Sequence, residues 1–510
     1  MPTKKNRRFP ALRNTLLAAA AISLTACSAI APAPLETAEI EAVNQADQQA
    51  MRKDVAPITG PLTLEEALAR ALKYNLDRRA KMMEEALALN QLDVNRYDML
   101  PRLTGQMNWR SRSNDSTSRS LDPNTGEVSS QGFISQDRSH QLTDLDFTWG
   151  LLDLGLGYYG SRQQANRVLV ASERRRKAMH LLMQDVRTAY WRAASAQKLH
   201  SRVQATIALG EEALSDSRKV EQERVRNPVE ALRYQRQLLE NLRLLEAINQ
   251  ELLSAQVDIA SLINAPLDTS IEIADEEIST DSSLIAQLPI ARLEEVALRN
   301  NPDLLEHHYS AQVAREETRK TMARLFPNVS FSYGVKYDSD SYLINRNWNE
   351  AGLQLSFNFM NLLTGPVQIK MAKAGVALAD QRRMATQMAV LTQLHLARLQ
   401  VVNARSQFER AEQVYATDVR LSELMQNRAA VQAASKLERV SNDTSTILSL
   451  LRRYQALAQV QTAESRMLAQ LGVEPRIGSS DDLSLSELTA QIKAQNNPWA
   501  SLKASIEAQQ

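Results

Sequence analysis

Two halves of this 510-residue chain carry the same landmarks in the same order. Asn75 lies 26 residues before Pro101, and Asn301 lies 26 residues before Pro327, so a single offset of 226 aligns both pairs. A repeat of this size constrains the fold more than any other feature, because both halves must be able to form the same kind of unit.

A second alignment follows farther along each half. The run Phe147–Gly155 aligns without a gap with Phe357–Gly365, at an offset of 210. The segment between the two landmarks is therefore expected to be 16 residues shorter in the second half. Each half is expected to read helix, strand, long loop, strand, very long helix and returning helix. We expect a first repeat over residues 61–266, a linker over 267–288, a second repeat over 289–475 and a C-terminal tail over 476–510.

The composition excludes some classes of protein. Lys and Arg (60) nearly balance Asp and Glu (59), so the chain lacks the basic excess of a nucleic-acid-binding protein, and no nucleic-acid partner is expected. Aromatic residues make up only 5%, with 15 Gly and 16 Pro, which is sparse for a set of compact α/β domains. After the N-terminal segment there is no apolar run of about 18 residues, so no membrane-spanning helix is expected.

The N-terminus has the pattern of a targeting segment. Basic residues from Lys4 to Arg13 precede an apolar stretch, so residues 1–26 are expected to be a signal peptide. The following Leu24-Thr25-Ala26-Cys27 resembles the lipobox of bacterial lipoproteins, which predicts acylation of Cys27; the alternative is an ordinary signal peptide that happens to contain a small residue here. Cys27 is the only cysteine, so an intramolecular disulfide is excluded. Residues 27–60 are expected to be a polar, lipidated tether.

Four segments alternate between apolar and polar residues, as half-buried strands do. They lie at about 102–110, 142–149, 328–337 and 352–359. About half of the apolar residues are aromatic, and the polar sets carry Asp, Lys and Arg. A soluble sheet would give the same alternation, but these compositions favour a lipid-facing barrel with a wet lumen. The residues expected to face lipid are Met107, Trp109, Phe147, Trp149, Phe331, Tyr333, Phe357 and Phe359.

Very long helices are expected after each pair of strands. Between Ser161 and Asn227 there is no proline, and small or apolar residues recur every three or four positions, as in a helix seam. At about 1.5 Å per residue, roughly 65 to 70 residues would span about 100 Å. The chain is expected to reverse at Asn227-Pro228, and the returning helices are expected to end near Asn264 and at Gly472. A soluble coiled-coil rod would explain the helices alone.

Together these features resemble the TolC-type outer-membrane channels of Gram-negative bacteria. The matching pieces are Leu64-Glu65-Glu66-Ala67-Leu68 with Asn75, the Leu100-Pro101 and Phe326-Pro327 steps, and Trp149-Gly150-Leu151-Leu152-Asp153. The resemblance covers roughly residues 62–475. It implies an α+β fold with a transmembrane β-barrel completed by a homotrimer, four strands per protomer, above a long α-helical barrel. It also implies a periplasmic adaptor and an inner-membrane pump of RND or ABC type as partners, in efflux or type I secretion.

The resemblance also points to a gate at the helix tips. Glu230 and Glu438 occupy the first acidic position of the family's tip motif, whereas its glycine is missing from both halves. A solvated helix end would carry similar charges, and that reading stays open. The expected gate residues are Arg226, Glu230, Arg233, Lys436, Glu438 and Arg439.

No enzymatic chemistry is expected. The six histidines form no i, i+4 metal pair, and no phosphate-binding loop or nucleophile motif occurs. We therefore expect no catalytic residues, no metal site and no cofactor. The expected function is that of a passive outer-membrane exit channel; the alternative is a structural periplasmic coiled-coil lipoprotein without a pore.

Overall fold

The computed structural model describes residues 33–222, 228–275, 288–430, 436–474 and 482–494, which fall into two units that divide after Val55. In the first unit, α2 (Thr37–Arg52) is a helix with no buried residue. The side chains of Glu36 and Glu39 form a capping box at its start, which explains why part of the expected tether is helical. The signal peptide and Cys27 lie outside the described residues.

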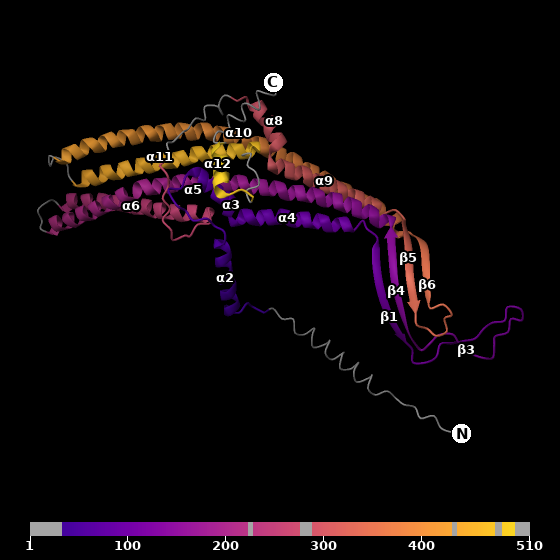
Figure 1. Cartoon of the computed structure of the whole chain (residues 1–510). Coiled ribbons are helices and arrows are strands. Elements are labelled where there is room, and N and C mark those ends of the chain that lie inside the picture. Colours follow the sequence, from indigo (N-terminus) through magenta and orange to yellow (C-terminus); the bar gives the residue numbers. More distant parts are fainter. Residues whose placement is uncertain (1–32, 223–227, 276–287, 431–435, 475–481, 495–510) are drawn as a thin grey trace. The chain divides into compact units, whose positions relative to one another are not determined.

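The second unit contains the same order of elements twice (Figure 1). The first series is α3 (Leu64–Tyr74), α4 (Leu76–Tyr97), β1 (Arg102–Ser111), β4 (Ser139–Gly150), α5 (Leu151–Gln222) and α6 (Pro228–Leu262). The second series is α8 (Ile290–Asn300), α9 (Pro302–Ala323), β5 (Asn328–Asp338), β6 (Asn347–Ser356), α10 (Met360–Ala430) and α11 (Lys436–Leu471). Two short strands, β2 (Thr117–Ser118) and β3 (Phe133–Ile134), pair within the loop that follows β1.

Each half begins with two helices, where the sequence predicted one. An asparagine ends the first helix and begins the second. The Asn75 side chain accepts a hydrogen bond from the N–H of Arg78, and the Asn301 side chain accepts one from the N–H of Leu304. Both asparagines have extended backbones, which interrupt the helix, and asparagine is a favoured N-cap residue.

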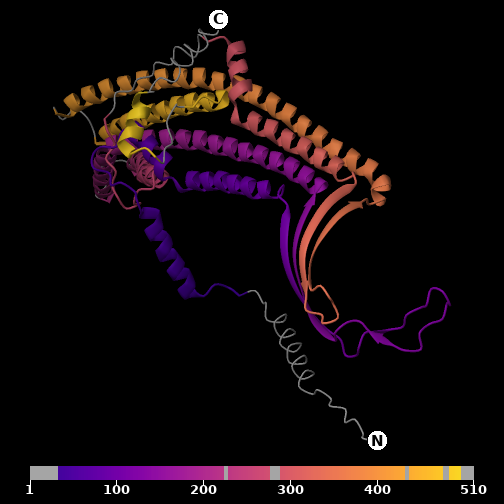
Figure 2. The same cartoon turned by 45° about the vertical axis from the view of Figure 1, so that its right-hand side comes forward.

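The four long strands form one antiparallel sheet in the order β1-β4-β5-β6 (Figure 2). Phe147 lies opposite Leu103 on one side and opposite Tyr333 on the other, and Tyr333 lies opposite Ala351. Residues that face each other across neighbouring strands share a face of the sheet. The alternating apolar sets of all four strands therefore lie on one face and the polar sets on the other.

The last strand lies earlier in the chain than the sequence predicted. β6 covers Asn347–Ser356 rather than 352–359, so Phe357 and Phe359 follow the strand. The side chain of Asn358 accepts a hydrogen bond from the N–H of Met360 at 3.0 Å, which turns the chain into α10. The predicted boundaries of β1, β4 and β5 agree with the structure to within three residues.

The strand register also corrects the second offset. Arg102 pairs with Thr148, and Asn328, which corresponds to Arg102, pairs with Ser356. Thr148 thus corresponds to Ser356, which is an offset of 208 instead of 210. The ungapped alignment was misleading because similar apolar residues recur every two positions in both strands.

A pair of corresponding glycines shows that the offset of 208 also applies within the long helices. A Cβ on Gly157 would lie 2.9 Å from the side chain of Met99, and a Cβ on Gly365 would lie 3.2 Å from that of Leu325. Met99 and Leu325 differ by 226 and the two glycines by 208. Each glycine therefore lets a long helix pass the end of the preceding helix at corresponding positions.

The long helices begin earlier than predicted. α5 has 72 residues and starts directly after β4, and α10 has 71 residues. At about 1.5 Å per residue each is about 105 Å long. The predicted helix ends are confirmed: α6 ends at Leu262 shortly before Asn264, which has a φ of 54°, and α11 ends at Leu471 before Gly472, which has a φ of 64°. Of the predicted reversal at Asn227-Pro228, Asn227 lies outside the described residues and Pro228 begins α6.

Apolar residues of the predicted helix seams form the core. Val186, Leu199 and Val203 on α5 are fully buried, as is Leu394 on α10. None of the helices in the described ranges combines the length and hydropathy that a membrane-crossing helix needs.

Two segments predicted to be connectors also contribute to the core. In the expected linker, Ile271 and Ile273 are buried, and Ile273 forms a parallel bridge with Leu62. In the expected tail, α12 (Leu485–Ala494) packs on α3 and buries Leu488 and Ile492. These segments were misjudged because short apolar pairs in a polar context carry no periodic signal.

Candidate functional site

In the single chain, many side chains on the apolar face of the sheet are exposed. Met107 and Trp109 on β1 are each 71% exposed, and Trp149, Phe331 and Tyr333 are also exposed. A large exposed apolar patch on a folded chain marks a surface that contacts protein or lipid. Six of the eight predicted lipid-facing residues lie on this face: Met107, Trp109, Phe147, Trp149, Phe331 and Tyr333.

Aromatic contacts extend across this region. Phe147 and Phe331 meet edge to face with ring centroids 6.4 Å apart. Phe357 and Phe359, the two predicted residues that lie beyond β6, contact each other in the same manner at 5.2 Å. Phe359 remains exposed, so both residues mark the apolar transition between the sheet and α10.

The opposite face of the sheet is charged. Asp144 and Asp146 on β4 lie beside Lys336 on β5, whose Nζ lies 2.9 Å from the carboxylate of Glu350 on β6. A Cβ on Gly334 would clash with the carboxylate of Asp146, which would have to move to admit a larger residue there. One face thus favours an apolar environment and the other favours water, which is the arrangement of a sheet that separates lipid from a wet passage.

A cluster of carboxylates joins the two loops at the end of the sheet away from the long helices. Asp340 accepts hydrogen bonds from the backbone N–H groups of Asp137 and Tyr342, both at 3.1 Å. Asp137 in return accepts from the N–H of Ser341 at 2.6 Å and from its hydroxyl. Burial alone would raise the pKa of Asp340, but the two backbone donors and His140 outweigh it and lower this pKa below its ordinary value. Sequence reasoning missed this cluster, because single aspartates in loops carry no distinctive pattern.

A second polar network fixes the junction between the halves. The guanidinium of Arg176 on α5 pairs with Glu173 and Glu474 and donates to the carbonyl oxygens of Asn300 and Gly472. Burial would raise the pKa of Glu474, whereas His180, 3.6 Å away, and the hydrogen bond from Arg176 lower it. This network holds the α8–α9 junction and the end of α11 against α5. No local sequence pattern predicts this network, because its members lie far apart in the chain.

The two helix tips lie near each other at the end of the unit away from the sheet (Figure 1). Val440 on α11 is packed against Leu214, Leu238 and Leu242 of the α5–α6 pair. Four of the six predicted gate residues lie near this contact. Glu230 and Arg233 lie near the start of α6 and Glu438 and Arg439 near the start of α11, all exposed, whereas Arg226 and the side chain of Lys436 lie outside the described residues.

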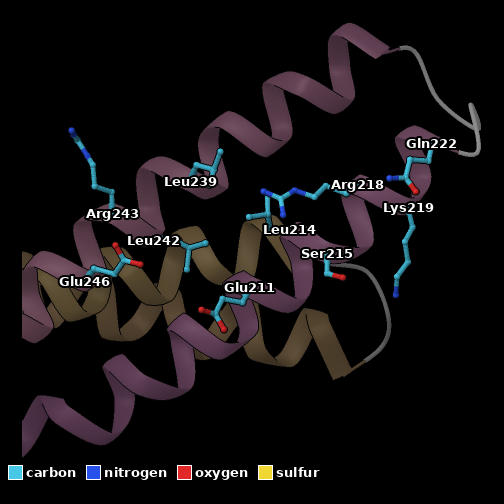
Figure 3. Close-up of a pocket in the computed structure, with 10 residues that line it drawn as sticks. All are labelled: Glu211, Leu214, Ser215, Arg218, Lys219, Gln222, Leu239, Leu242, Arg243 and Glu246. Atoms are coloured by element: carbon cyan, nitrogen blue, oxygen red, sulfur yellow. The ribbon is translucent and has the colours of Figure 1, made fainter.

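A groove of 660 Å³ runs between α5 and α6 close to their tip (Figure 3). Its charged lining residues are of mixed sign, with Arg218, Lys219 and Arg243 beside Glu211 and Glu246. Leu239 and Leu242 add an apolar strip. The lining contains neither a nucleophile paired with a base nor a set of metal ligands, and no cluster of metal-binding side chains occurs in the described part of the chain.

Comparisons with solved structures identify the fold. The outer-membrane channel OprN aligns with a TM-score of 0.61 and 15% identity, over 80% of this chain and 89% of its own. CusC aligns with a TM-score of 0.60 and 16% identity, over 82% and 95% of the two chains. The CmeC outer membrane channel of Campylobacter jejuni aligns with a TM-score of 0.61 and 13% identity, over 84% and 89%.

Sequence comparisons gave no match, either to a protein-family model or to a curated protein. The structural likeness covers at least 80% of the chain in each case. The chain has the α+β fold of TolC-type outer-membrane channels.

Proposed function

We propose that this protein is an outer-membrane exit channel, a passive duct through the outer membrane and the periplasm. The observation that carries the proposal is a four-stranded sheet with an exposed apolar face, a charged opposite face and two open edges. The sheet continues directly into helices of about 70 residues. The similarity to solved channels supports the same function.

Three copies complete the barrel in this proposal. Four strands are too few to enclose a lumen, and open strand edges are not tolerated in lipid. A homotrimer with four strands per protomer gives a barrel of twelve strands, with outer-membrane lipid around it. The matched elements of the two halves support an internal twofold repeat within each chain. The tunnel is formed by the long helix pairs of the three copies.

The duct requires energy from elsewhere. A periplasmic adaptor and an inner-membrane pump of RND or ABC type are the proposed partners, and they would contact the tunnel near its tips. Drug or metal efflux and type I secretion are both compatible with a duct, because the chemistry that selects the cargo belongs to the pump. The protein itself is proposed to be non-catalytic and to use no cofactor.

A lipid anchor at Cys27 is the second part of the proposal. The lipobox-like sequence before this single cysteine supports it, and several acyl chains on one residue give stable membrane attachment. The variant Cys27→Ala should lose labelling by a fatty-acid probe. Labelling that persists in the variant would exclude the anchor, while the barrel could still insert.

The channel itself is tested by extraction and electrical recording. Protein extracted from the outer membrane should migrate as a heat-modifiable trimer, contain β-structure and produce discrete conductance steps in planar bilayers. A protein that leaves the membrane once Cys27 is replaced and never conducts would instead favour a structural coiled-coil lipoprotein without a pore. Identification of the co-purifying pump would separate efflux from secretion.

A further inference from the structure

We propose that β6 of one copy pairs with β1 of the next copy, antiparallel and in one register, with Leu355 opposite Met107 and Leu353 opposite Trp109. The inference rests on the proposed function, because it takes a second copy of this chain as the partner at both edges of the sheet. It adds the residues that meet, which the trimer alone does not specify.

On both edge strands, β1 and β6, the backbone N–H and C=O groups that point away from the sheet belong to odd-numbered residues. The N–H of Arg112 donates to the carbonyl of Arg138, so even-numbered residues of β1 bond to β4 and odd-numbered residues point their backbone groups outward. The N–H of Asp338 donates to the carbonyl of Arg346, so odd-numbered residues of β6 also point outward. Odd-to-odd pairing satisfies both edges and keeps the apolar residues on one face.

The chain contains a template for this pairing where its two halves join. β4 of the first half pairs with β5 of the second, and Phe147 lies opposite Tyr333. The residue of β6 that corresponds to Phe147 is Leu355, at the offset of 208, and the residue of β1 that corresponds to Tyr333 is Met107, at the offset of 226. If the same contact recurs between copies, Leu355 meets Met107.

The resulting register is complementary in both polarity and charge. Leu353 is 77% exposed and Trp109 is 71% exposed in the single chain, and the pairing brings these two apolar side chains together. On the polar face, the same register places Glu350 opposite Arg112, a pair of opposite charges. Directly opposed apolar pairs and opposite charges each stabilise an antiparallel pair of strands.

The long helices support the same arrangement independently of the strands. Within the chain, the side chain of Gln163 on α5 donates to the carbonyl of Val313 and to the carboxylate of Glu317 on α9, and it accepts from Lys320. The corresponding residue on α10 is Met371, and the corresponding residues on α4 are Leu87, Gln91 and Val94.

In the proposed interface, Met371 of one copy would make apolar contacts with Leu87 and Val94 of the next. Met371 is 71% exposed, Leu87 is 57% exposed and Val94 is 65% exposed, whereas the intrachain counterpart Gln163 is buried. The polar contact inside the chain would thus be replaced by an apolar contact between copies. Because α10 and β6 contribute one surface while α4 and β1 contribute another, the interface is head-to-tail, which is the kind of interface that a closed ring of three copies requires.

Cysteine cross-linking tests the register in the full-length protein in outer membranes. The N–H of Ser339 donates to the carbonyl of Gln141, so odd pairs of the template are hydrogen-bonded and even pairs are not. The transferred pair of Asn108 and Gln354 is therefore non-hydrogen-bonded, with the closer Cβ separation that a disulfide requires. Oxidation of the Asn108→Cys, Gln354→Cys variant should give covalent dimers and trimers. The native chain, whose only cysteine is Cys27, should give none.

Two register controls use the same strand face. Gln354→Cys combined with Gln106→Cys or with Arg110→Cys displaces the second cysteine by two residues, to about 7–8 Å, beyond disulfide reach. Each control should cross-link at least about fivefold less. The variant Met371→Cys, Leu87→Cys should cross-link with a bifunctional maleimide even if the strand variants do not fold.

The outcomes separate this inference from the channel proposal. Preferential cross-linking of either register control, in a protein that still forms trimers, overturns the proposed register and leaves the channel standing. Absence of all cross-links in a protein that is monomeric in detergent overturns both. Efficient cross-linking of the Asn108–Gln354 and Leu87–Met371 pairs supports the proposed interface.

Discussion

The side-chain amide of Asn75 donates a hydrogen bond to the carbonyl of Leu262 at 3.1 Å, and thereby ties the break between α3 and α4 to the end of α6. The second half contains the same contact, from Asn301 to the carbonyl of Gln470 at 2.9 Å. Each asparagine thus caps a helix with its oxygen and holds the end of another helix with its nitrogen. The carbonyl groups at a helix end lack intrahelical partners, so this single side chain satisfies two helix termini.

Replacement of Asn301 should therefore destabilise the protein. Asn301 is 2% exposed, so Asn301→Ala removes a buried cap and leaves the Gln470 carbonyl without this donor. The expected cost is about 2 kcal/mol, the sum of a lost cap and a lost hydrogen bond. Thermal unfolding followed by circular dichroism should show a lower midpoint. Asn166→Ala, in the first quarter of α5 and away from its ends, is the matched control and should change the midpoint little, because alanine favours helix. Equal midpoints for both variants would exclude the proposed role of Asn301.

Gly472 should tolerate no side chain. Its φ of 64° is unfavourable for alanine, and a Cβ would lie 2.1 Å from the carbonyl oxygen of Asn300. Gly472→Ala should cost more than about 2 kcal/mol, because the left-handed conformation and the backbone clash add. Gly375→Ala in α10 is the control, since nothing lies within 4 Å of its added Cβ, and it should stabilise the protein by about 0.5–1 kcal/mol. A wild-type midpoint for Gly472→Ala would contradict this contact.

The sequence predicted the periodic parts of the fold and missed the contacts between them. Strand alternation and helix seams are local patterns, so β1, β4, β5 and the ends of α6 and α11 could be assigned directly. The break at Asn75 was missed because an asparagine inside a helical pattern can be either a surface residue or a cap. The start of β6 at Asn347 was missed because Asn347 and Asn349 are polar at positions of the apolar face while Trp348 is aromatic on the other face, which reverses the alternation.

The face assignment of the strands predicts unequal effects of a charge. Phe331→Arg places a cation on the apolar face and should cost about 2–4 kcal/mol near the middle of the membrane. Ser330→Arg, one residue earlier on the polar face, should be tolerated because arginine would face water there. The measurement is the amount of heat-resistant trimer in outer-membrane fractions. Similar losses for the two variants would indicate a buried soluble sheet.

Acid should loosen the link between the loops at the far end of the sheet. The pKa of Asp340 is lowered in the folded protein, so its carboxylate stabilises the linked loops above the ordinary aspartate pKa of about 4. This stabilisation is lost as the pH falls through the lower folded-state value. Spin labels at Ser120→Cys and Ile344→Cys should give one narrow distance at neutral pH and a broad distribution in acid.

A neutral variant isolates the contribution of this carboxylate. Asp340→Asn should broaden the distance distribution already at neutral pH, because the amide cannot replace the charge beside His140. Asp122→Asn is the control, since its carboxylate accepts a local hydrogen bond from the N–H of Asn124 and lies in the loop between β1 and β4, which also contains Asp137. If Asp340→Asn retains a narrow distribution at neutral pH, this carboxylate does not hold the loops together.

The candidate site was predictable only in part, because some of its features depend on local patterns and others on contacts between distant residues. The apolar face could be inferred from Met107, Trp109 and their counterparts, since their exposure depends on alternation within a strand. The Asp137–Asp340 and Arg176–Glu474 contacts depend on residues more than 200 positions apart. Such contacts arise from how the two halves pack, and no local pattern encodes them.

The last prediction concerns the helix tips and rests on the proposed trimer. Three copies would bring six exposed carboxylates, from Glu230 and Glu438, close to the threefold axis of the tunnel. Charges in a constriction with little water act more strongly than on an open surface, so these rings should attract cations. Replacing both residues with Gln should reduce cation preference in planar-bilayer recordings, and Arg439→Ser should raise conductance by removing a positive charge from the constriction. Glu240→Gln, farther along α6 and exposed, is the control and should leave selectivity unchanged. Unchanged selectivity and conductance in the tip variants would mean that these residues do not line the narrowest part of the duct.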